Sequence, residues 1–140
     1  MNAAIYPSLG FTVAMLVCTA YFLMGGLPLL VLKHDTPLDA RFVRSFFNLY
    51  YKVAIGTSLG ACVSYALWGR LRFALGAGAL LAVTLLLRRT LIPAMQQLGN
   101  RIQGDDQRSI RDFRRIHIAA LAINLLQLVL IVWGVVLLSL

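Results

Sequence analysis

The chain has 140 residues, of which 60% are hydrophobic and 13% charged, whereas soluble domains carry about a quarter charged residues. A soluble protein of this size could not bury so much apolar surface. The formal net charge is +8, but the Lys and Arg residues flank apolar segments instead of forming a polar basic face, which argues against nucleic-acid binding. The composition predicts an integral membrane protein that contacts a bilayer, including its anionic lipids.

Four apolar segments are each long enough to cross the hydrocarbon layer, which takes about 20 helical residues. They predict one membrane domain over residues 1–140, folded as an all-α four-helix bundle. The expected spans are 6–32, 42–68, 71–93 and 116–140. We expect a bend near the end of the first span, where Pro28 follows two glycines. The second and third spans are so close in sequence that they should form a tight helical hairpin.

The main extramembrane segment is expected at residues 94–115, between the third and fourth spans. Asp106 or Ser109 is predicted to cap a helix that continues into the fourth span. The segment is rich in arginine, which suits contact with partner proteins or anionic lipid. These arginines are Arg101, Arg108, Arg111, Arg114 and Arg115.

The orientation follows from the distribution of Lys and Arg, because short basic loops stay on the cytoplasmic side. Most basic residues flank the first and third loops, against only Arg70 and Arg72 in the second loop. We therefore expect both termini outside and the basic loops in the cytoplasm, in a bacterial inner membrane.

Small residues at four-residue spacing allow close packing of helices within lipid. The second and third spans each carry such a stripe, which predicts that these two helices pack together. The residues are Gly56, Gly60, Ser64, Ala74, Gly78 and Ala82. The same stripes would also suit a homo-oligomer. Cys18 and Cys62 are isolated in apolar surroundings, and we expect them to be unpaired.

Polar residues inside predicted spans are the candidate functional groups, because they are costly in lipid. Asn48 and Lys52 lie on one face of the second span, and Asn124 and Gln127 share a face of the fourth. Lys52 either occupies a buried site or extends its ammonium to the headgroups. The amides either join helices through hydrogen bonds or line a cytoplasm-facing pocket for a small polar ligand.

Two histidines, His34 and His117, are expected at the cytoplasmic border. A pair of imidazoles could ligate copper or the iron of a haem. The spacing matches no established metal motif, so the cofactor stays open. No nucleophile elbow, phosphate-binding loop or zinc-protease motif occurs, which favours a protein that is not an enzyme.

Four short motifs give the chain a family resemblance. They are YFLMGGLPLL, RSFFNLYYK, LIPAMQQL and FRRIHIAALAINLL. With these motifs the chain resembles the transmembrane protein 205-like family, a small four-span membrane domain of unknown function. His117 and Asn124 match the last motif of that family, whereas Ala120 replaces its serine and Asn48 replaces a frequent proline. The resemblance implies a four-helix membrane bundle and supplies no catalytic residues.

Three functions remain as hypotheses. The first is an accessory or scaffold subunit, or an assembly factor, of a larger membrane complex. The second is a small transporter or channel-like protein with a cytoplasm-facing polar pocket. The third is a haem- or copper-binding membrane protein.

Overall fold

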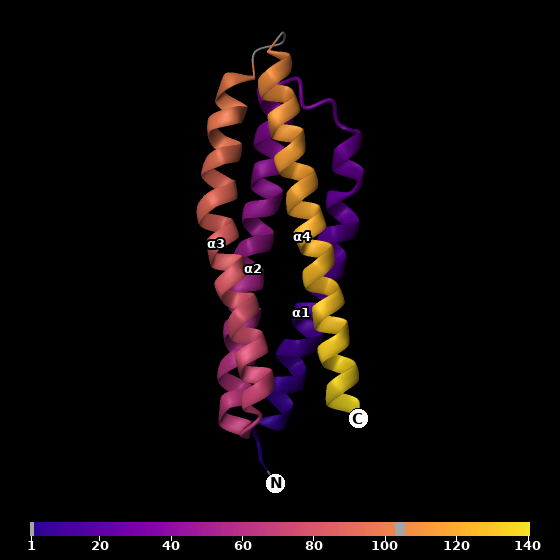
Figure 1. Ribbon diagram of the computed structural model, residues 1–140, viewed down its shortest axis with the longest axis vertical. Helices are drawn as coiled ribbons and strands as arrows, with labels where there is room; N and C mark the ends of the chain where they lie inside the picture. Colours follow the sequence, from indigo (N-terminus) through magenta and orange to yellow (C-terminus); the bar gives the residue numbers. More distant parts are fainter. Residues whose placement is uncertain (1, 103–105) are drawn as a thin grey trace.

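The computed structural model describes residues 2–102 and 106–140, which form four α-helices and one short 3-10 helix, without a strand. The elements are α1 (Ile5–Gly26), η1 (Pro28–Val31), α2 (Pro37–Trp68), α3 (Leu71–Arg101) and α4 (Gln107–Ser139). The helices run up and down in a long bundle (Figure 1). The predicted all-α bundle is therefore confirmed.

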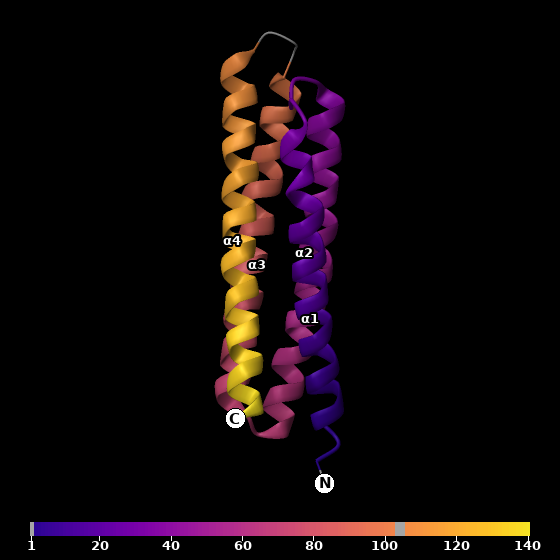
Figure 2. The same ribbon diagram turned by 90° about the vertical axis from the view of Figure 1, so that its right-hand side faces the viewer.

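The two ends of the bundle differ in charge. The start of α1, the α2–α3 turn and the end of α4 lie at one end, which we call the hairpin end (Figures 1 and 2). The α1–α2 connection, the end of α3 and the start of α4 lie at the other. This second end, which we call the basic end, carries Lys33 between η1 and α2, Arg101 at the end of α3 and Arg108 at the start of α4.

Within the described residues, three helical segments are long and apolar enough to cross a membrane, which indicates an integral membrane protein. These are Ile5–Val31, Leu71–Arg101 and Gln107–Ser139, whose most apolar 18-residue stretches have mean hydropathies of 2.0, 1.7 and 2.5. Helix α2 does not belong to this set, although a fourth apolar span was expected. Its first half carries Arg41, Arg44 and Lys52, and its second half is rich in glycine, serine and threonine, which dilutes the apolar content.

Local signals explain where the first two long helices end. Helix α1 ends at Gly26, and η1 follows directly with Pro28 as its first residue, at the position of the expected bend. Helix α2 begins after Thr36, whose side chain accepts a hydrogen bond from the Asp39 backbone at 3.2 Å. It ends at Trp68, and the next residue, Gly69, has a φ of 81° that reverses the chain into α3.

The segment 94–115, predicted as an extramembrane loop with a helix leading into the fourth span, is mostly helical. Helix α3 continues through the exposed Pro93 to Arg101, and α4 starts at Gln107. The predicted cap is confirmed, because Asp106 accepts hydrogen bonds from the backbone and hydroxyl of Ser109 at 3.2 and 2.7 Å. Residues 103–105, also within the predicted loop, lie outside the described residues.

The small residues of α2 pack differently from expectation. A Cβ at Gly60 would overlap the Phe11 ring, so this glycine admits α1 rather than α3. A Cβ at Gly56 would meet nothing within 4 Å, and this glycine is exposed. Ser64 is buried, but its hydroxyl bonds to the Gly60 carbonyl of its own helix at 2.6 Å.

The stripe on α3 is divided between the core and the surface. Gly78 faces α2, because a Cβ there would lie 3.5 Å from Sγ of Cys62. Ala74 is buried in the core, whereas Ala82 is exposed. Cys18 and Cys62 are both free thiols, as expected.

Candidate functional site

A cavity of about 420 Å³ lies between α2 and α3 at the basic end. Its polar lining consists of two guanidinium groups from α2 and two side-chain amides from α3. The lining residues are Pro37, Ala40, Arg41, Arg44, Met95, Gln96, Gly99, Asn100 and Ile102. None of these nine residues carries a carboxylate, so the cavity is rich in hydrogen-bond donors and positive charge.

The cavity floor is held by close packing of the two helices. Ala40, Met95 and Ile102 are buried, with at most 2% of each residue exposed. A Cβ at Gly99 would lie 3.2 Å from Cβ of Ala40, so the absence of a side chain lets α3 approach α2 at this point. The polar groups above this floor therefore project from a rigid base.

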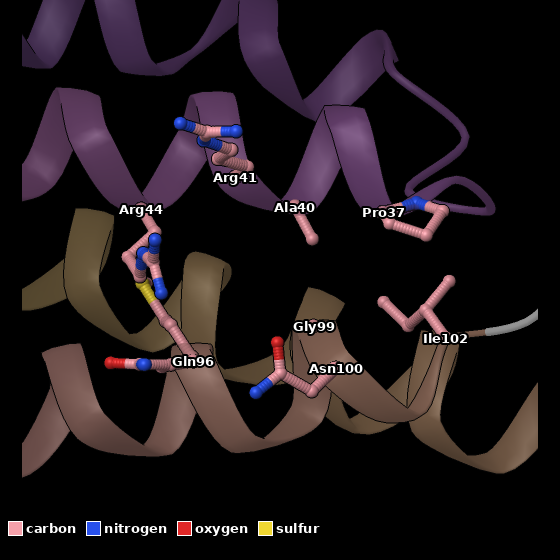
Figure 3. A pocket seen from close by; sticks show the side chains of 9 residues that line it. Pro37, Ala40, Arg41, Arg44, Gln96, Gly99, Asn100 and Ile102 are labelled. Atoms are coloured by element: carbon pink, nitrogen blue, oxygen red, sulfur yellow. The ribbon is translucent and has the colours of Figure 1, made fainter.

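The polar side chains differ in how they face the cavity (Figure 3). Arg44 is half-buried and extends from α2 toward Gln96 on α3. The Asn100 side chain lies along α3, with its amide oxygen on the side of α2 and its nitrogen on the opposite side. Arg41 is exposed, and its guanidinium lies along α2, turned away from α3. Arg44 is thus the polar side chain that reaches most directly from one wall of the cavity to the other.

Two of the predicted intramembrane residues lie elsewhere on α2. Asn48 is half-buried, and its Oδ1 accepts a hydrogen bond from Nε of Arg88 on α3 at 3.2 Å. Lys52 is exposed on the outer surface of α2, so of the two alternatives the site buried within the chain is not observed. Neither side chain faces the amides of α4 in a shared pocket.

The two histidines meet in the core, although 83 residues separate them. Both are 0% exposed, and Nε2 of His34 lies 3.1 Å from Nδ1 of His117. Nε2 of His117 lies 3.2 Å from the Gly26 carbonyl, which can only accept. His117 therefore carries its proton on Nε2, and its Nδ1 accepts from Nε2–H of His34. This leaves Nδ1 of His34 as a bare, buried nitrogen without a partner among the described residues.

Burial favours the neutral form of His34. Its pKa is lowered by burial and, to a smaller degree, by the positive charge of Arg114, whereas Asp39 and Asp35 act in the opposite direction. Its φ of 56° is left-handed, a region that histidine occupies more readily than most residues. A neutral, enclosed imidazole suits a structural hydrogen bond.

The histidine geometry bears on the haem and copper hypotheses. The two imidazole rings are in edge contact, with centroids 5.3 Å apart. The Phe47 ring centroid lies 5.3 Å from that of His117, and the Phe113 centroid lies 5.7 Å from that of His34. A porphyrin does not fit between rings that hydrogen bond directly. Copper could take only two nitrogens here, because no group of three His, Cys, Asp or Glu side chains is formed within residues 2–102 and 106–140.

The fourth-span amides occupy the middle of the bundle. Gln127 is buried, with its Oε1 3.4 Å from the Tyr50 hydroxyl and its Nε2 3.5 Å from Oγ1 of Thr84. These long hydrogen bonds join α2, α3 and α4. A small cavity of about 20 Å³ beside them, also lined by Thr19, has room for one water molecule.

Asn124 is the exception among these polar groups. It is 3% exposed, and neither Oδ1 nor Nδ2 has a hydrogen-bond partner in the part of the chain that the structure describes. An unpaired buried amide typically costs about 1–3 kcal/mol, so this residue is the least satisfied in the core.

The arginines of the predicted loop lie on helix surfaces. Arg101 is exposed in the last turn of α3, and the remaining arginines are exposed on the first turns of α4. Arg114 is tied to the connection after α1, since it donates to the Leu30 carbonyl at 3.1 Å. Arg108, Arg111 and Arg115 are the exposed arginines of α4 that remain for a partner or lipid.

A second, apolar groove of about 940 Å³ lies between α3 and α4 toward the hairpin end. Ala77, Leu80, Leu130 and Ile131 line it, with Arg70 and Arg72 at the α2–α3 turn. In a bilayer, acyl chains would cover such a surface.

Gln96 and Asn100, which line the cavity opposite Arg44, were not among the residues predicted from the sequence. Both follow Pro93, where the span was expected to end, so they were assigned to a loop. Their i, i+4 spacing places them on one face of α3, a signal that becomes visible only once the helix is extended. Comparison with protein-family models, curated proteins and solved structures finds no match to this chain.

Proposed function

We propose that this protein is an accessory or scaffold subunit, or an assembly factor, of a larger membrane complex, and not an enzyme. The observation that carries the proposal is the separation of polar groups. In the core, the histidines and Gln127 bond mainly to other protein groups. At the basic end, by contrast, the arginines of α4 are exposed. Such a surface suits a partner subunit or anionic headgroups.

The proposal includes four crossings. Helices α1 and α3 both start at the hairpin end and run to the basic end (Figure 2). If both cross the bilayer, α2 must return the chain across it, despite its lower hydropathy. The apolar side chains on its outer surface then face lipid, and α2 packs along α3 as a hairpin (Figure 1). These exposed side chains include Leu49, Leu59, Val63 and Leu67.

The orientation is part of the same proposal. The basic end would face the cytoplasm of a bacterial cell, with both termini on the outer side of the inner membrane. The resemblance to the transmembrane protein 205-like family is consistent with this topology and rests on the four short motifs. A second copy of the chain is an alternative partner.

Purification in a mild detergent tests the functional proposal. We expect the tagged chain to retain a second subunit in fixed stoichiometry. The variant Arg108→Glu/Arg111→Glu/Arg115→Glu should lose that subunit while keeping its melting temperature, because these side chains are exposed. The control variant Arg72→Glu, which reverses a charge at the hairpin end, should retain the second subunit. Recovery of the wild type as a monomer alone would contradict the proposal.

A transporter is the second candidate, and the unpartnered Asn124 is the observation that favours it. A buried polar group without a hydrogen-bond partner in the protein can form hydrogen bonds to a ligand during transport. Asn124→Leu should then abolish flux in proteoliposomes, whereas Lys52→Leu on the outer surface should not. Equal flux in the wild type and Asn124→Leu would eliminate this candidate.

A further inference from the structure

The cavity between α2 and α3 has the chemistry of an anion site. Guanidinium groups only donate hydrogen bonds, and each side-chain amide offers two N–H donors beside its oxygen. Arg41 and Arg44 bring two positive charges, and Gln96 and Asn100 bring neutral donors from the opposite helix. A cation would find two like charges here, whereas an anion would find complementary groups on both walls.

No carboxylate forms an ion pair with Arg41 or Arg44 within the part of the chain that the structure describes. Asp106 instead accepts hydrogen bonds from Ser109. No hydrogen bond joins Arg41 or Arg44 to another side chain within residues 2–102 and 106–140. The start of α2 and the end of α3 meet at this cavity, so their opposed helix dipoles offset each other. The two arginines therefore bring side-chain positive charge to a place where the helix dipoles add little net charge.

We propose that this cavity binds a phosphate group, with Arg44 as its primary ligand, Asn100 and Gln96 on the opposite wall, and Arg41 turning in from the surface of α2 to complete the site. A planar guanidinium can donate two parallel hydrogen bonds to phosphate oxygens. The volume of about 420 Å³ exceeds that of a water molecule, about 30 Å³, many times. It leaves space for a phosphate and bridging water.

The phosphate can come from an anionic lipid headgroup or from a soluble phosphate. The cavity lies at the end of the bundle that our proposed function places at the membrane surface, so the site deepens that proposal. Binding of phosphate itself needs no protein partner. Loss of phosphate binding and absence of a partner subunit are therefore separate results.

The experiment uses the full chain in two settings. In detergent, calorimetry measures binding of inorganic phosphate. In nanodiscs of phosphatidylcholine with a minor fraction of phosphatidylglycerol, native mass spectrometry measures retention of the anionic lipid. We expect saturable binding in at least one setting, weakened by added salt because the contacts are ionic. Arg44→Gln should weaken this binding roughly tenfold or more, since it removes the charged guanidinium that binds the phosphate.

Matched variants separate the cavity from general charge. Arg89→Gln removes the same charge from an exposed position of α3 outside the cavity and should change affinity by less than about twofold. Circular dichroism checks that Arg44→Gln is folded. If it is not, Asn100→Leu is used in its place, because Asn100 is exposed on the opposite wall of the cavity. This variant should weaken binding several-fold.

Competition between inorganic phosphate and retained lipid supports a site for the phosphate group itself, and retention of lipid without phosphate binding supports a headgroup site. Failure of the wild type to bind either probe overturns the proposal. Equal losses in Arg44→Gln and Arg89→Gln also overturn it, because net charge would then explain the binding.

Discussion

His34 and His117 form a direct hydrogen bond of 3.1 Å in the core of the bundle, and His117 continues it to the Gly26 carbonyl. The chain of bonds joins the α1–α2 connection, α4 and the end of α1. It explains how His34, which belongs to a non-helical segment, can be fully buried at the basic end.

The first prediction concerns this histidine pair. His34→Ala leaves Nδ1 of the buried His117 without a donor and removes a packed ring. We expect a loss of about 1–3 kcal/mol in unfolding free energy, seen as a lower melting temperature in detergent. Lys33→Ala, at the exposed preceding residue, is the control and should stay close to the wild type. Equal melting temperatures for His34→Ala and the wild type would count against a structural role.

The second prediction concerns pH. Burial lowers the pKa of His34 below its usual value of 6.5, so the unfolded chain takes up this proton more readily than the folded one. Stability should be complete above about pH 6.5 and should decline as the pH falls further. His34→Asn, which tolerates the left-handed backbone and does not titrate in this range, should show a shallower decline. Melting temperatures measured from neutral to mildly acidic pH follow this decline, and identical slopes would refute the assignment.

The third prediction contrasts the two buried amides of α4. Asn124 has no partner among the described residues, so Asn124→Leu removes an unsatisfied group and should leave stability unchanged or raised. Gln127→Leu deprives the Tyr50 hydroxyl and Thr84 of a partner and should lower stability by about 1 kcal/mol. Thermal melts of both variants measure the contrast. A larger loss for Asn124→Leu than for Gln127→Leu would reverse it.

The fourth prediction concerns helix packing. Gly60→Val places a side chain against Phe11, so α1 and α2 must shift, at a cost of about 1–3 kcal/mol. Gly56→Val, one turn away on the same helix, meets open space and serves as the control. We expect only Gly60→Val to lower the melting temperature markedly. A comparable effect at Gly56 would instead place that face in an oligomer contact.

Much of the fold could be predicted from the sequence, because long apolar runs separated by Gly, Pro and charged residues predict membrane helices directly. The cap at Asp106 was also readable, since an acidic residue before a helix has a clear physical role. The extension of α3 past Pro93 could not be predicted from the sequence, because proline usually ends a helix. Only tertiary packing reveals that α3 continues.

The candidate site was harder to predict, since it depends on contacts between distant segments. His34 and His117 were singled out together, but as metal ligands, and sequence spacing could not show that they bond to each other. Gly60 was predicted to be a packing residue, but the sequence did not indicate that it packs against Phe11. The helix that fills a glycine groove depends on how the bundle is assembled, and not on the stripe itself.

The most direct test of the account is the sidedness of the chain. In a background with both native cysteines replaced by alanine, single cysteines at Asn2, Lys33, Arg72, Arg108 and Ser139 are treated with a membrane-impermeant maleimide. We predict that Asn2→Cys, Arg72→Cys and Ser139→Cys react in intact cells, whereas Lys33→Cys and Arg108→Cys react only after permeabilisation. Reaction of Lys33→Cys and Arg72→Cys from the same side would show that α2 does not cross, and would contradict the four-span bundle.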